Sequence, residues 1–362
     1  MATLRFNDSD IGEDRDSSKK KSVDKPVWQE VLSFMPKSLQ AKLSMLQEAL
    51  LNTLEEVRLR PGKPLQIMAG GESYFIHRDT AQSSPYGCEA LSLNDVASVL
   101  QTISQSSIYA LEQEFRNGYL TLPGGHRVGF VGEAVLERGS IKTLKNISSL
   151  NIRLSREVRG CAEKVLPYLL ETDGGRPFHT IIVSPPCCGK TTLLRDLVRH
   201  FSSAINCKGY NVGVVDERSE IASCYRGIPQ KDVGLRTDVL DNCPKAEGML
   251  ILLWSMSPDI LATDELGRSE DVAVVEEVLN AGVTLLATVH GSNMVEVANR
   301  PILKKIMQQG IFQRAIILGK SHGPGTITDV LELPSEKSIL NKHLRTTHKA
   351  ITSFSKTSER EG

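Results

Sequence analysis

The sequence lacks an excess of charge of either sign. Lys plus Arg and Asp plus Glu both number 43 in its 362 residues, so the formal net charge is zero. A dedicated nucleic-acid binder usually carries a basic excess, and we therefore expect no nucleic-acid partner. Binding of a single nucleotide needs only local positive charge, and it remains compatible with this composition.

The cysteine patterns of disulfide-rich and zinc proteins are missing as well. The seven cysteines are an odd number, none forms a C-x-x-C pair, and no signal-like segment opens the chain. These features favour free thiols in a reducing cytoplasm over a disulfide framework or a zinc site. The longest conspicuous apolar run, Met249 to Trp254, is far shorter than the roughly 20 residues of a membrane span. Any contact with a membrane would therefore go through partners or a surface helix.

Between two polar ends, the sequence has two regions with different hydrophobic patterns. Residues 1–25 mix charges and serines without apolar periodicity, which predicts a disordered tail, and residues 336–362 predict a second polar tail. Residues 26–160 combine helices with a hairpin and predict a small α+β domain. In residues 161–335 short apolar runs alternate with helices, as in parallel strands that are buried on both faces. These runs begin at Thr180, Val212, Ile260, Val283 and Ala315.

The strongest motif is a phosphate-binding P-loop. It follows the first buried run and precedes a predicted helix, which is the strand–loop–helix context that a P-loop requires. Backbone N–H groups at such a helix start bind phosphate oxygens, and the helix dipole favours their charge. Ser184 stands where the usual pattern begins with glycine, but the Gly-Lys-Thr core is intact. The predicted nucleotide contacts are Ser184, Pro185, Pro186, Cys187, Cys188, Gly189, Lys190, Thr191 and Thr192.

These residue types predict ATP and Mg²⁺ as ligands. Lys190 would bridge the β and γ phosphates, and the Thr191 hydroxyl would hold Mg²⁺. A later apolar run ends in Asp264 and Glu265, where the aspartate suits Mg²⁺ coordination and the glutamate suits polarising the attacking water. Thr191 and Asp264 are therefore the predicted metal ligands. The absence of an N-K-x-D guanine signature favours ATP, although adenine and guanine nucleotides both stay open.

Two further strand ends carry candidate catalytic residues. Asp216 to Glu220 follows the second run, and Glu217 competes with Glu265 for the role of catalytic base. His290 ends another run, where it would face the γ-phosphate and report hydrolysis to the rest of the domain. A histidine at a strand end is often structural, and both interpretations of His290 stay open.

The motifs of this sequence resemble those of the traffic ATPases of secretion systems and pili. The strand ends at Asp216, Asp264 and His290 are similar to the acidic box, Walker B segment and histidine box of that superfamily. More narrowly, the sequence resembles the stage III sporulation protein AA family from about residue 27 to 332. The stretches that carry this second resemblance are 122–129, 224–230 and 236–248.

The resemblance implies a RecA-like P-loop ATPase domain of the α/β class, preceded by the smaller α+β N-terminal domain. It also implies a homo-oligomeric ring, a hexamer, which energises a channel-like complex between mother cell and forespore of endospore-forming bacteria. The ring would lie in the mother-cell cytoplasm, docked on membrane proteins of that complex. In related motors the N-terminal domain folds over the nucleotide, which makes Arg127, Arg153 and Arg156 candidates for phosphate contacts. Two positions depart from the family pattern: Cys187 replaces an expected glycine and Trp254 an expected arginine.

Three other functions fit the P-loop. A nucleic-acid translocase would need a basic face or pore loop, and no aromatic–basic cluster is apparent. A small-molecule kinase would need an acceptor site and a lid. A scaffold that binds nucleotide without hydrolysing it would not need the Lys190, Thr191 and Glu265 set.

Overall fold

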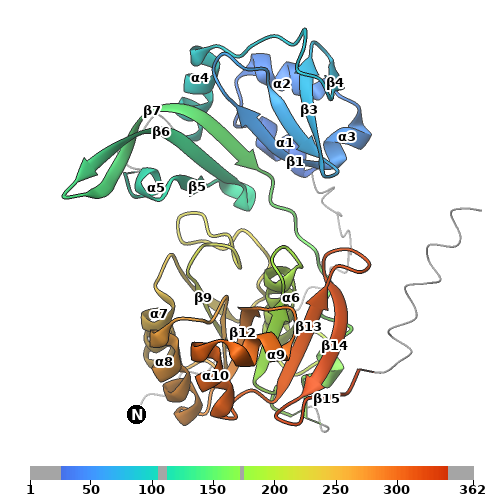
Figure 1. The fold of residues 1–362 in the computed structure, drawn as a ribbon, viewed down its shortest axis with the longest axis vertical. Helices are drawn as coiled ribbons and strands as arrows, with labels where there is room; N and C mark the ends of the chain where they lie inside the picture. Colours follow the sequence, from blue (N-terminus) through green and yellow to red (C-terminus); the bar gives the residue numbers. More distant parts are fainter. Residues whose placement is uncertain (1–25, 105–111, 172–174, 341–362) are drawn as a thin grey trace, which may run out of the picture.

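The computed structural model describes residues 26–104, 112–171 and 175–340. Within these ranges the chain forms two separate sheets, one above the other in Figure 1. The tail predicted at 1–25 and most of the tail predicted at 336–362 lie outside the described residues. The domain boundaries at 160 and 335 stay predictions, although the two sheets have separate hydrophobic cores.

The N-terminal sheet is antiparallel and has seven strands in the order β4-β3-β2-β1-β7-β6-β5. Its strands are β1 (Leu54–Leu59), β2 (Gln66–Ala69), β3 (Glu72–His77), β4 (Thr80–Gln82), β5 (Tyr119–Thr121), β6 (Arg127–Glu137) and β7 (Ser140–Arg153). Its helices are α1 (Val27–Leu32), α2 (Lys37–Ser44), α3 (Glu48–Asn52), α4 (Leu93–Ile103) and α5 (Glu112–Asn117). The strands β6 and β7 continue beyond the sheet as a projecting two-stranded arm (Figure 1).

Burial alternates along β1, because one face of this sheet packs on the helices and the other is accessible. The sequence predicted only β5 and β6 of this sheet and missed β1 to β4 and β7. The strands β1 to β4 are at most six residues long, so each gives a weak periodic signal.

The second sheet contains the parallel strands that the sequence predicts. Its order is β10-β9-β11-β12-β8-β13-β14-β15, parallel up to β13 and antiparallel beyond it. The strands are β8 (Thr180–Ser184), β9 (Val212–Asp216), β10 (Thr237–Asp241), β11 (Ile260–Thr263), β12 (Thr284–His290), β13 (Arg314–Gly319), β14 (Thr326–Glu332) and β15 (Lys337–Ser338). The five predicted runs correspond to β8, β9, β11, β12 and β13, whereas β10, β14 and β15 were missed.

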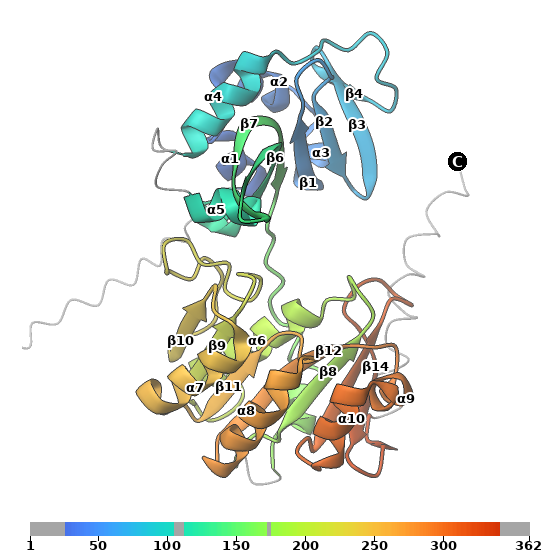
Figure 2. The same cartoon turned by 60° about the vertical axis from the view of Figure 1, so that its left-hand side comes forward.

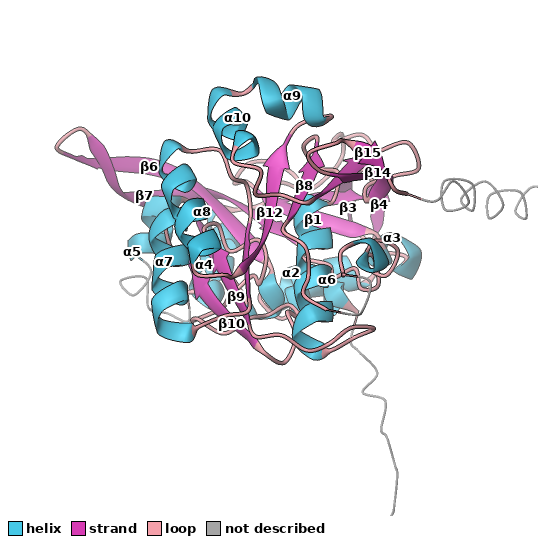
Figure 3. Cartoon of the chain, turned by 90° about the horizontal axis from the view of Figure 1, so that it is seen from below, coloured by secondary structure: helices cyan, strands magenta, loops and turns pink. Residues whose placement is uncertain are grey.

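Helices cover both faces of this sheet (Figure 3). They are α6 (Lys190–Ser203), α7 (Lys245–Met256), α8 (Ser269–Asn280), α9 (Met294–Asn299) and α10 (Pro301–Gln308). Leu194 and Phe201 of α6 belong to the core on one face, and Met249 of α7 and Val275 of α8 belong to the core on the other. The α/β fold class is therefore confirmed.

The strand order brings the predicted site residues together. In a parallel sheet the carboxyl ends of all strands lie on the same side of the sheet, and ligands bind there in open α/β folds. Ser184 at the end of β8 pairs with His290 of β12, and Thr263 at the end of β11 pairs with Ala287 of the same strand. β12 thus lies between the P-loop strand and the strand that leads to Asp264.

No helix within the described ranges is long and apolar enough to cross a membrane.

Candidate active site

The P-loop has a backbone that requires glycine at one position. Gly189, the N-cap of α6, has φ +86°, and an added Cβ would lie 3.2 Å from the backbone nitrogen of Gly325. Only glycine adopts this conformation freely and permits so close an approach. The neighbouring Gly325 N–H donates to the Cys188 carbonyl over 2.8 Å, which fixes the loop against the turn before β14. Cys188 is buried, whereas Cys187 is exposed at the loop tip.

Lys190 is the first residue of α6, and its positive charge has no partner among the described residues. Its ammonium makes no hydrogen bond or ion pair with any residue that the structure describes. The helix that it begins extends to Ser203, so the positive end of the helix dipole lies at the same place. The two features together form a site for an anion such as a phosphate group.

The two predicted metal ligands are in direct contact. The Thr191 hydroxyl donates to Asp264 Oδ2 over 2.7 Å, and the Thr288 hydroxyl of β12 donates to Asp264 Oδ1. A hydroxyl and a carboxylate are the hard oxygen ligands that Mg²⁺ prefers. No group of three or more His, Cys, Asp or Glu side chains that could hold a metal occurs in the described part of the chain. A magnesium ion here would therefore take its other ligands from phosphate and water.

The side chains of Glu265 and His290 are in contact at the carboxyl ends of the parallel strands. His290 Nε2 lies 2.8 Å from Glu265 Oε1, and Arg218 Nη1 lies 3.4 Å from Glu265 Oε2. His290 Nδ1 is buried and has no partner among the described residues. The carboxylate that the sequence assigns as base is thus in contact with the histidine that the sequence assigns as sensor.

The competing glutamate, Glu217, has a different environment. Arg268 Nη1 lies 2.8 Å from Glu217 Oε1, and Lys245 Nζ lies 3.3 Å from Glu217 Oε2. Both carboxylate oxygens of Glu217 therefore face cations.

Asp216 at the end of β9 is almost completely buried and fixes the acidic segment, residues 216–220, in place. Its carboxylate accepts the backbone N–H groups of Glu220, Ile221 and Ala222 over 2.8–2.9 Å. Burial raises its pKa to about 6 in spite of these bonds. The next turn is fixed from α6, because the Arg195 guanidinium donates to the carbonyls of Glu220 and Ile221.

The structure separates the three candidate arginines. Arg127 lies 3.5 Å from the centre of the Tyr119 ring, and its Nη1 is 3.6 Å from Glu220 Oε1 of the acidic segment. Arg153 pairs with Glu56 of the N-terminal sheet over 3.3 Å, and Arg156 donates to the Leu54 carbonyl. Of the three, Arg127 is the one that contacts the second sheet.

Arg195, Lys245 and Thr288 belong to this site but were not predicted from the sequence. Thr288 had a usable signal, because it lies two positions before His290 on a strand and therefore shares its face. Lys245 and Arg195 are on helices, and nothing in their local sequence indicates which loop they contact.

Two cavities adjoin the site. One of about 480 Å³ is next to the P-loop, and its lining includes Cys161, Pro324, Gly325 and Ile327. Another of about 220 Å³ is lined by Glu265, His290, Lys245 and three arginines. The first is partly apolar and the second strongly charged, as a nucleotide base and its phosphates require, respectively.

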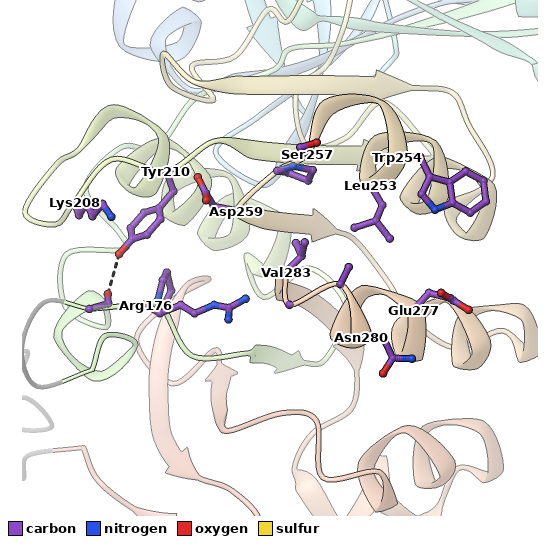
Figure 4. A pocket seen from close by; sticks show the side chains of 15 residues that line it. Arg176, Lys208, Tyr210, Leu253, Trp254, Ser257, Asp259, Glu277, Asn280 and Val283 are labelled. Atoms are coloured by element: carbon purple, nitrogen blue, oxygen red, sulfur yellow. Dashed lines mark hydrogen bonds between the residues drawn. The ribbon is translucent and has the colours of Figure 1, made fainter.

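A third cavity, of about 870 Å³, lies at the opposite end of the parallel strands. Figure 4 shows Trp254 at one end of it and the Arg176 side chain extending toward Val283. These residues precede the strands, whereas the P-loop follows one. The tryptophan that departs from the family pattern is therefore far from the candidate site along the strands, and it is 73% exposed.

Comparison with solved structures shows a shared fold. The chain matches the ATPase DotB of Legionella pneumophila with a TM-score of 0.51 at 14% identity, over 91% of this chain and 86% of that one. It matches the pilus retraction motor PilT, solved with bound ADP, with a TM-score of 0.51 at 16% identity, over 88% and 87% of the two chains. The RecA-like class predicted from the sequence is confirmed.

Comparison of amino-acid sequences identifies a smaller group of similar proteins. The chain is 40% identical over 305 residues to stage III sporulation protein AA of Bacillus subtilis (strain 168), which covers 84% of this chain and 94% of the relative. It is 26% identical over 160 residues to the protein SEEDLING PLASTID DEVELOPMENT 1 of Arabidopsis thaliana, over 44% and 22% of the two. The family model described as "Sporulation stage III, protein AA" matches residues 28–337. The chain belongs to the stage III sporulation protein AA family.

Proposed function

We propose that this chain is an ATP-hydrolysing motor. The observation that carries the proposal is the P-loop with an unpaired Lys190, next to a continuous series of contacts through Thr191, Asp264 and Thr288 to Glu265. This is the set of groups that phosphoryl transfer to water needs: a cation and N–H groups for the phosphates, metal ligands and a base.

Each group has a separate task in the proposed reaction. Lys190 and the start of α6 bind the β and γ phosphates of ATP, and the base occupies the cavity beside Gly325 and Cys161. Thr191 and Asp264 would hold Mg²⁺, which neutralises phosphate charge when bound. Glu265 accepts a proton from the water whose oxygen attacks the γ-phosphorus, and ADP and inorganic phosphate result. His290 contacts the same carboxylate and is placed to respond to that change of charge.

The assembly in which this motor acts is also a proposal. Membership of a stage III sporulation family and the fold of DotB and PilT support a motor that serves a secretion-like complex. We infer a homo-oligomeric ring, a hexamer, in the mother-cell cytoplasm. It would dock on membrane proteins of a channel complex between mother cell and forespore, since the force must be passed to a partner.

The experiment is phosphate release by the purified chain with Mg²⁺–ATP, combined with nucleotide binding by Lys190→Ala. Loss of the Lys190 ammonium should weaken binding about 10²-fold, because a charge-assisted hydrogen bond contributes roughly 1.5–3 kcal/mol. Lys304→Ala, an exposed lysine of α10, is the matched control and should bind as the parent does. A parent chain that releases no phosphate, or a folded Lys190→Ala variant with parental affinity, would contradict the proposal.

A further inference from the structure

The backbone of Glu265 is held in an unusual conformation from both sides. Its φ is +56°, in the left-handed region that residues with a side chain rarely adopt. Its N–H donates to the Thr288 hydroxyl over 2.9 Å, and its carbonyl accepts from Lys245 Nζ over 2.6 Å. Such a conformation persists only where its surroundings fix it, and these two bonds do so. They thereby fix the direction in which the side chain leaves the Glu265 backbone.

Lys245 is a buried cation that the reaction proposed above does not use. The side chain is 4% exposed, and the residue is the first of α7, where the helix dipole disfavours a positive charge. The ammonium is balanced by Glu217 at 3.3 Å, whose other oxygen contacts Arg268. Burying a charge at this place is unfavourable unless it is paired, so the pair with Glu217 is what allows the lysine to remain.

The packing of α7 fixes where Lys245 can reach. Gly248 lies one turn further along the helix, and a Cβ added there would be 2.6 Å from the Val215 side chain of β9. The helix therefore approaches β9 as closely as its backbone permits. At this distance the lysine spans the gap between the acidic segment after β9 and the loop after β11. Lys245 also lines the small cavity that contains Glu265 and His290.

We propose that Lys245 is a positioning residue for Glu265, and that Glu217 is its counter-ion and not a catalytic base. The inference rests on the proposed ATPase function. The lysine acts through the Glu265 carbonyl: it holds the peptide in the left-handed conformation in which the carboxylate faces the reacting water. Glu217 and Glu265, which compete for one role in the sequence, have two roles in the structure.

The test compares the rate of ATP hydrolysis with nucleotide affinity in Lys245→Met, Glu217→Gln and the double variant Lys245→Met/Glu217→Met. Lys245→Met should lower kcat about 10²-fold, because a misplacement of about 1 Å at a reacting group has an effect of that size. Its affinity for nucleotide should stay parental, since Lys190 and the loop are untouched. Glu217→Gln keeps an oxygen for the lysine and should lose less than about 10-fold, whereas removal of a true base would lose at least about 10²-fold.

The double variant distinguishes positioning from a merely structural ion pair. It replaces a buried pair with apolar side chains, which commonly preserves stability. Positioning predicts a stable protein with parental affinity and a kcat as low as in Lys245→Met. A double variant that hydrolyses ATP at the parental rate would overturn the inference. Should the methionine variants fail to fold, Glu217→Gln decides alone: a loss of about 10²-fold or more in that variant would overturn the inference.

Glu265→Gln separates this inference from the function on which it rests. If the parent hydrolyses ATP, Glu265→Gln does not and the Lys245 variants do, only the inference fails. If the parent is inactive, both fail. If the parent is active and Glu265→Gln is fully active, the assignment of Glu265 as base and the inference fail, while the ATPase function stands.

Discussion

The burial of Asp216 makes the stability of the folded protein depend on pH. Its carboxylate is almost completely buried at the end of β9, and burial raises its pKa to about 6 from the usual 3.8. The folded protein therefore binds this proton more tightly than the unfolded chain. The contribution to the free energy of unfolding is complete below about pH 4, and it is lost as pH rises through about 6.

We predict that Asp216→Asn becomes more stable relative to the parent as pH rises from 4 to 7. The gain should be about 1–3 kcal/mol, because each unit of pKa difference corresponds to 1.36 kcal/mol. Urea unfolding at the two pH values measures it. Asp238→Asn, an exposed position on β10, is the control. An equal stability difference between Asp216→Asn and the parent at both pH values would contradict the prediction.

At the scale of elements, the connection between β9 and β10 joins the two sheets. Lys231 in this connection is buried, and its ammonium donates to the carbonyls of Gly124 and Ser155 over 3.0 and 3.1 Å. Gln230 accepts from the Gly124 N–H over 2.9 Å. The backbone N–H groups of Gln230 and Lys231 donate to the Ala222 carbonyl, and the Ala222 N–H donates to the Asp216 carboxylate. A continuous series of bonds therefore leads from Asp216 to the turn before β6 and the segment after β7. Figure 2 shows the connection between β9 and β10 rising toward the N-terminal sheet.

We predict that Lys231→Met weakens this connection and leaves the P-loop intact. Two hydrogen bonds from a charged donor are lost, each worth roughly 1.5–3 kcal/mol, although solvent replaces part of that. Hydrogen exchange should accelerate in the turn 123–125 and in residues 154–157, while nucleotide affinity stays parental. Lys304→Met serves as the control. Unchanged exchange in both segments of a folded Lys231→Met variant would show that the connection does not hold the sheets together.

At the scale of the whole molecule, two distant elements expose apolar side chains. Val131 and Leu136 on the β6–β7 arm are 63% and 64% exposed, and Ile251 and Trp254 on α7 are 46% and 73% exposed. Exposed apolar patches of this kind mark contact surfaces. Two different patches on one chain favour head-to-tail contacts, which close into rings when the rotation allows. This supports the homo-oligomeric ring that we propose.

We predict that the chain assembles when it binds nucleotide and its membrane partners. Light scattering with a non-hydrolysable ATP analogue should give a mass approaching six copies, and the ATPase rate per chain should rise with concentration. In fractionated sporulating cells, part of the protein should sediment with membranes only when the partners are present. A chain that stays monomeric, wholly soluble in both strains, and indifferent to concentration in its activity would contradict the docked ring.

The sequence by itself determined the P-loop, the strand-end residues Asp264, Glu265 and His290, and the α/β class. These depend on local patterns: a strand, a loop and a helix within twenty residues, or an apolar run that ends in a carboxylate. Backbone geometry follows from such patterns directly, which is why Gly189 and Lys190 lie where the sequence predicts them.

Only the tertiary structure decided which of these residues touch. The order of strands places β12 between β8 and β11, and this order makes Thr288 the link between Asp264 and Glu265. The close approach of α7 to β9 gives Glu217 a lysine partner, and the N-terminal sheet gives Arg153 a partner in Glu56. Such contacts join residues far apart in the chain, and they depend on how buried faces pack together. No local periodicity encodes that packing, because the free energy that selects it comes from the whole core.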